Sequence, residues 1–104
     1  MDALKPITFL EAVLINPAMY TMDGTFEEVV AFLEGYFSGV AKGNPYAPPV
    51  VEWSAFRTWL AEQLETEPSL EFQTLRANCG DSETALRKFR DLVAVFQRKY
   101  KAGD

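Results

Sequence analysis

Histidine is absent from this sequence of 104 residues, and cysteine occurs once. The missing histidines exclude imidazole-based catalytic triads and histidine-ligated metal sites. The single cysteine, Cys79, excludes a disulfide within the chain and has no histidine to activate it as a nucleophile. We therefore expect a protein that is not an enzyme and that uses no metal or other cofactor.

Long hydrophobic runs and glycine-rich phosphate loops are missing too. No apolar stretch approaches the roughly 18–20 residues that a membrane-spanning helix needs. The first six residues, Met-Asp-Ala-Leu-Lys-Pro, do not begin a secretory signal. Together with the single cysteine, these absences favour a cytoplasmic protein that does not enter a membrane. The glycine-rich phosphate-binding patterns G-x-G-x-x-G and G-x-x-x-x-G-K do not occur, so nucleotide binding is not expected.

Basic residues are outnumbered, because ten Lys and Arg stand against fifteen Asp and Glu and give a net charge of -5. This surplus disfavours general attraction to nucleic acid phosphates and favours a basic partner. The surplus of acids over bases lies in residues 1–40, whereas residues 85–104 are rich in Lys and Arg. Such cations suit the C-terminal turns of a last helix. A nucleic-acid-binding tail is the alternative interpretation.

The spacing of apolar residues is helical almost throughout the chain. Apolar positions recur every three or four residues in five segments. The predicted helices run over Phe9 to about Ile15, Phe26 to about Val40, about Val51 to Leu64, Leu70 to about Asn78, and Asp81 or Ser82 to about Lys101. Thr8 and Thr25 each precede a glutamate by three residues, the spacing of a capping box at a helix start.

These segments predict an all-α fold, a compact bundle of four to five helices. No alternating pattern is long enough to require a sheet. We expect one domain over residues 1–104, with the ends 1–7 and 101–104 frayed. Gly35 and Gly39 within the second predicted helix indicate the close approach of another element. The stretch from Ala41 to Pro49 contains three prolines and predicts a loop.

The second predicted helix carries the first candidate binding surface. Glu27, Glu28 and Glu34 lie away from its apolar stripe, and Asp23 stands at its entry. A solvated acidic face is the simpler interpretation of these carboxylates. Without histidines among them, they do not indicate a metal site. The sharper hypothesis is that they meet a basic partner.

Aromatic residues outside the clearest stripes form the second candidate surface. Tyr46 lies in the proline-rich loop, and Trp53 follows in the next helix. Tryptophan is favoured at the energetic centres of protein interfaces, so Trp53 is either a contact residue or part of the core. The same alternatives apply to Trp59.

The order of several short motifs resembles a group of small bacterial cytosolic proteins. The quoted segments are Thr8-Phe9-Leu10-Glu11, Asn16-Pro17-Ala18-Met19-Tyr20, Ala31-Phe32-Leu33-Glu34-Gly35-Tyr36 and Phe56-Arg57-Thr58-Trp59-Leu60. A closing amphipathic helix with Phe89 and Phe96 looks like theirs as well. Members with a proposed role are immunity-type proteins of polymorphic toxin systems. The resemblance therefore implies a small helical inhibitor of a toxin.

The sequence thus predicts a non-enzymatic protein-binding module, with an immunity-type inhibitor of a basic toxin as its sharpest form. Electrostatic complementarity would speed association with such a partner. The alternative is a small helical adaptor or regulatory subunit, in one form a homodimer, that contacts partners through exposed aromatics. Neither nucleic acid nor a membrane is the expected partner. A nucleic-acid-binding regulator would be distinguished by exposed cations that point one way from the last helix.

Overall fold

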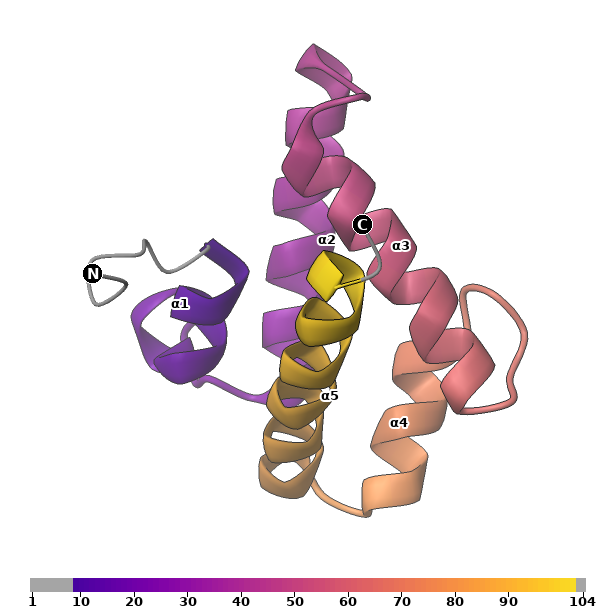
Figure 1. Ribbon diagram of the computed structural model, residues 1–104. Coiled ribbons are helices and arrows are strands. Elements are labelled where there is room, and N and C mark those ends of the chain that lie inside the picture. The colour runs from indigo at the N-terminus through magenta and orange to yellow at the C-terminus, as the bar shows by residue number, and fades with distance from the viewer. Residues whose placement is uncertain (1–8, 103–104) are drawn as a thin grey trace, which may run out of the picture.

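The computed structural model describes residues 9–102, which form five α-helices and one short 3₁₀ helix (Figure 1). The elements are α1 (Phe9–Ile15), η2 (Pro17–Met19), α2 (Phe26–Gly43), α3 (Pro48–Gln63), α4 (Glu71–Cys79) and α5 (Ser82–Ala102). No strand occurs in this part of the chain. The predicted all-α bundle of four to five helices is confirmed. Of the predicted frayed ends, 1–7 and 101–104, residues 101 and 102 belong to α5, while 1–7 and 103–104, together with Thr8, lie outside the described residues.

Helix α5 organises the bundle. It contacts each of α1, α2, α3 and α4. α2 and α3 run antiparallel as a hairpin behind it, while α1 lies on one flank and α4 on the other (Figure 1). The turn between α2 and α3 projects beyond the other helices (Figure 1). This arrangement leaves α2 in contact with α3 on the side turned away from α1.

The core forms where α2, α3, α4 and α5 meet, and aromatic rings fill most of it. Phe56 and Phe89 stack in its centre, with ring centroids 5.9 Å apart. Trp53 is buried between Phe37 and Phe72, which stack against it at 4.8 and 5.8 Å. Because only 6% of Trp53 is exposed, the structure corrects its interpretation as an exposed contact residue. Trp59 is half-buried against the same core.

The start of α2 is fixed by two side-chain caps. Thr25 Oγ1 accepts a hydrogen bond from the Glu28 N–H at 3.2 Å, which is half of the predicted capping box. In place of the reciprocal bond to Thr25, the Glu28 carboxylate accepts from the Asp23 N–H at 2.7 Å. The Phe26 N–H donates to Ser82 Oγ at 2.6 Å. This last bond ties the first turn of α2 to the first turn of α5.

Two expectations about α2 and its exit are wrong. The predicted loop 41–49 is shorter, because α2 continues to Gly43 and α3 begins at Pro48. Proline is well suited to the first turn of a helix, where its missing N–H would have no intrahelical partner. Gly35 and Gly39 do not mark a close approach, since a Cβ at either position would meet nothing within 4 Å. Both glycines face open space.

Candidate functional site

Two of the predicted acidic residues border a groove between α2, α3 and α4. Glu27 and Glu34 lie on the same side of α2, as their spacing of seven residues predicts. Val30 lies between them, and Phe26 and Phe72 complete an apolar floor. The groove has a volume of about 500 Å³. It therefore combines an apolar surface with charged edges, as protein-binding surfaces do.

Each of these two carboxylates is paired with an arginine from another helix. Arg76 of α4 donates from Nε to Glu27 Oε2 at 2.8 Å. Arg57 of α3 places Nη1 3.2 Å from Glu34 Oε2. The acidic face of α2 is thus partly neutralised in the structure. Sequence reasoning missed both arginines as members of the site.

Arg57 also joins Glu34 to a third carboxylate. Its Nε donates to Glu71 Oε2 at 2.5 Å, and its guanidinium carbon lies 5.5 Å from the centroid of the Phe72 ring. Glu71 is the first residue of α4 and is only 1% exposed. Its second oxygen, Oε1, is buried and has no hydrogen-bond partner among the described residues. A buried carboxylate oxygen without a donor is energetically costly.

The site as a whole carries one surplus negative charge. Three carboxylates, those of Glu27, Glu34 and Glu71, face the two guanidiniums of Arg57 and Arg76. Glu71 lines a neighbouring pocket instead of the groove, and it shares Arg57 with Glu34. The arrangement can therefore accept one further cation. No group of three or more candidate metal ligands occurs among residues 9–102.

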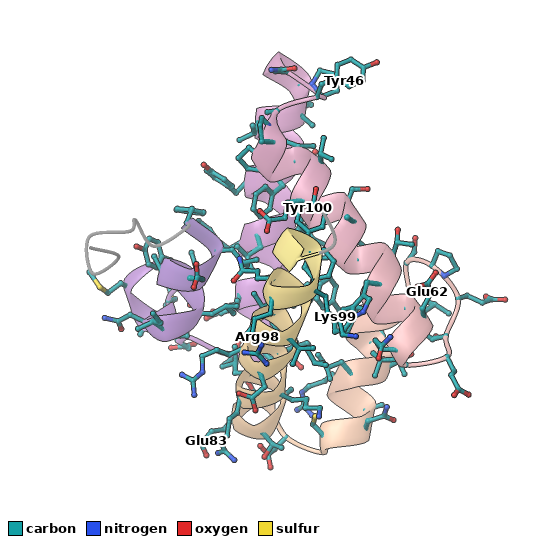
Figure 2. The ribbon with its side chains drawn as sticks, viewed as in Figure 1. Tyr46, Glu62, Glu83, Arg98, Lys99 and Tyr100 are labelled. Atoms are coloured by element: carbon teal, nitrogen blue, oxygen red, sulfur yellow. The ribbon has the colours of Figure 1, made fainter. Side chains whose placement is uncertain are left out.

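The other predicted site residues lie elsewhere. Asp23 is exposed at the entry of α2, and the carboxylate of Glu28 is engaged by the Asp23 N–H as a cap. Tyr46 is 83% exposed at the outer tip of the α2–α3 hairpin (Figure 2). The structure thus brings Glu27 and Glu34 together and places Asp23, Glu28 and Tyr46 outside the groove.

An apolar cleft of about 340 Å³ lies between α1, α2, α3 and α5. Phe9, Tyr36, Trp53 and Phe96 contribute to its lining, with Glu52 as its one charged side chain. Phe9 and Tyr36 stack with centroids 4.2 Å apart. Among residues 9–102, only Glu52 contributes a charged side chain to this lining, whereas the groove is bordered by charged side chains from three helices.

The cations of α5 are exposed but do not form a purely basic face. Arg87, Arg90 and Arg98 recur on one side of the helix, and Lys88 and Lys99 are exposed beside them. Figure 2 shows Arg98 and Lys99 in the C-terminal half of α5. Two exposed acids, Glu83 and Asp91, share the side of the three arginines. This mixture differs from the one-signed stripe typical of a nucleic-acid interface.

These observations describe a helical bundle with a charged groove between α2, α3 and α4. Comparison with known proteins adds no assignment, since no protein-family model, curated protein or solved structure matches the chain. Within residues 9–102, none of the helices has the length and apolar character needed to cross a membrane.

Proposed function

We propose that the protein is a non-enzymatic binding module that holds a basic segment of another protein in the groove between α2, α3 and α4. The exposed carboxylates of Glu27 and Glu34 at the edges of the apolar groove are the observation that carries the proposal, because a partner's Lys or Arg can replace the arginines that pair with them. An immunity-type inhibitor, which covers the basic cleft of a toxin, is the sharpest form. Such a module acts in the cytoplasm, where its free Cys79 stays reduced.

The energetics of the groove favour exchange of cations with a partner. Arg76 and Glu27 keep 33% and 60% of their side chains exposed. Exposed ion pairs contribute only about 0–1 kcal/mol, so a partner's cation can replace Arg76 beside Glu27 at little cost. The net charge of -5 attracts a basic protein from a distance and raises the association rate.

Site-specific photo-crosslinking tests the proposal. A benzoylphenylalanine is placed at Ala31, which is exposed and lines the groove, and in a second variant at Ser38, which is exposed on α2 but does not line it. Both proteins are produced in the cells that make the chain. We expect one basic protein to be crosslinked from Ala31 and not from Ser38. The same products from both positions, or none from Ala31, would contradict the proposal.

The purified partner then allows a charge test with a matched control. Glu27→Gln combined with Glu34→Gln should weaken binding about tenfold or more, which corresponds to about 1.4 kcal/mol. Glu62→Gln combined with Glu83→Gln makes the same charge change at two exposed sites outside the groove (Figure 2). We expect the control pair to change affinity by less than about threefold, because distant surface charges are screened by salt. Equal losses of affinity in the two double variants would contradict the proposal, because they would show that net charge alone determines binding.

The homodimeric adaptor is the second candidate, and the position of Tyr46 favours it. A tyrosine that is 83% exposed at a projecting tip is available to a second copy, and Val51 nearby in α3 is also exposed. Light scattering at increasing concentration should then give the mass of a dimer, and Tyr46→Ser should return it to a monomer. A monomer of wild-type protein at all concentrations would remove this candidate.

A further inference from the structure

A small pocket lies beside the groove, on the other side of Arg57. It has a volume of about 260 Å³ and opens between α3 and the connection from α3 to α4. Ser54 and Thr58 line it from α3, Pro68 and Ser69 from the connection, and Glu71 from α4. Arg57 borders both this pocket and the groove. A segment that lies in the groove therefore passes close to the pocket.

Glu71 gives this pocket its chemistry. Its carboxylate is almost fully buried, and only Oε2 is satisfied, by Arg57. Arg57 donates no hydrogen bond to Oε1, because its Nη1 pairs with Glu34 instead. Burial of a carboxylate oxygen without a donor costs free energy that a new hydrogen bond from a cation would recover. The pocket thus has an acceptor for which the described chain provides no donor.

The rest of the lining selects a cationic side chain over a neutral one. The local balance is one negative charge in excess, so an incoming charge of the opposite sign is favoured. The hydroxyl groups of Ser54, Thr58 and Ser69 line the pocket and are able to accept the remaining N–H groups of an ammonium or guanidinium ion. Trp53, which also lines the pocket, stacks with Phe37 and Phe72.

Because Oε1 is buried, a cation reaches it only if a neighbouring element moves, and Pro68 and Ser69 line the pocket next to Glu71. Ser69 adopts a φ of 81°, in the left-handed region that residues other than glycine rarely occupy. Both residues belong to the connection between two helices and are exposed.

From this combination we infer that the pocket beside Glu71 binds one arginine or lysine side chain of the protein partner, with its cationic head donating to Glu71 Oε1. The inference rests on the proposed function, which supplies the partner. It adds the anchoring residue: one basic side chain enters the pocket while the rest of the segment lies in the groove.

The test uses small probes, so that it does not depend on finding the partner. The ¹⁵N-labelled protein is titrated with N-acetyl-arginine amide, with N-acetyl-lysine amide and with N-acetyl-citrulline amide, the uncharged analogue of the arginine probe. We expect saturable shifts at the backbone amides of Ser54, Thr58, Ser69 and Glu71 with at least one cationic probe. The citrulline probe should leave these signals unchanged. Equal shifts with citrulline would overturn the inference.

Two variants and one control complete the test. Glu71→Gln removes the charge, and Thr58→Phe fills the pocket from an exposed position of α3. Each should weaken binding of the cationic probe at least tenfold. Glu62→Gln, an equal charge change at an exposed position of α3 outside the pocket, should leave it unaltered. If Glu71→Gln does not fold, Thr58→Phe decides, and undiminished binding to that variant would overturn the inference.

The two proposals fail in different ways. Crosslinking from Ala31 without probe binding at Glu71 would leave the binding module intact and remove the anchoring pocket. Probe binding without a crosslinked partner would keep the cation pocket and remove the proposed function.

Discussion

The two ends of the groove use the same pair of residue types in different surroundings. At one end, Arg76 meets Glu27, whose side chain is 60% exposed. At the other, Arg57 meets Glu34 and the buried Glu71 above the ring of Phe72. The two arginines are similarly exposed, at 33% and 29% of their side chains, so the ends differ in the burial of the carboxylates. Burial of Glu71 therefore makes Arg57 structural, whereas the exposed Glu27 leaves Arg76 free to exchange partners.

Among the residues at these two ends, loss of Arg57 should lower the free energy of unfolding most. Arg57→Met leaves the Glu71 carboxylate buried without a cation. We expect the free energy of unfolding to fall by about 3 kcal/mol, the lower end of the range for a broken buried pair, because Arg57 keeps 29% of its side chain exposed. Urea unfolding measures this. Arg76→Met is the control, and an equal loss in both variants would contradict the comparison.

The second prediction removes both members of the buried pair. Replacing a buried ion pair by apolar residues of similar volume is often neutral or stabilising. Arg57→Met combined with Glu71→Leu should therefore recover most of the stability lost in Arg57→Met, to within about 1 kcal/mol of wild type. A double-mutant cycle in urea gives the coupling energy. A double variant as unstable as Arg57→Met would mean that Glu71 is not the cause of the loss.

The exposed end should respond weakly and should depend on salt. Arg76→Gln is expected to lower the free energy of unfolding by about 0–1 kcal/mol at low ionic strength. In 1 M NaCl, where the Debye length is about 3 Å, the difference from wild type should vanish. The loss caused by Arg57→Met should persist at the same salt concentration, since a buried pair is screened less. If the stability losses of Arg76→Gln and Arg57→Met fell equally with salt, this prediction would be contradicted.

The smallest expected effect on stability is that of Asp81, which precedes the first residue of α5. Its pKa is lowered from 3.8, mainly because its carboxylate accepts the Thr84 N–H at 2.8 Å, with a smaller contribution from the charge of Arg76. A lowered folded-state pKa means that the stabilisation is present above pH 3.8 and is lost as the pH falls through the lowered value. The stability difference between wild type and Asp81→Ala should therefore shrink on acidification below pH 3.8. A difference independent of pH would contradict it.

Much of the fold follows from local patterns. The apolar stripes predicted all five helices, and α1 begins and ends at the predicted residues, Phe9 and Ile15. The exit of α2 differs from the predicted loop 41–49, because Pro48 and Pro49 begin α3 and proline favours the first turn of a helix. A proline can end one helix or begin the next, depending on its position relative to the helix, and composition alone does not give that position.

The site was predicted only in part, for a reason of distance along the chain. Glu27 and Glu34 share a helix, so their common face follows from spacing. Their partners do not, because Arg76 is 49 residues from Glu27 and the Arg57–Glu71 pair spans 14 residues. A glutamate in the first turn of a helix is ordinarily a favourable surface residue. Only the packing of α4 against α3 and α5 buries Glu71.

The central position of α5 bears on how the chain is made. The ribosome produces α1 to α4 before the helix that contacts all of them. At about 5–20 residues per second, the 21 residues of α5 take about 1–4 s to synthesise, and until then the apolar faces of the earlier helices lack their common partner. Folding of the bundle is thus expected to finish after translation of α5, and a nascent chain that stalls before it would be a substrate for chaperones.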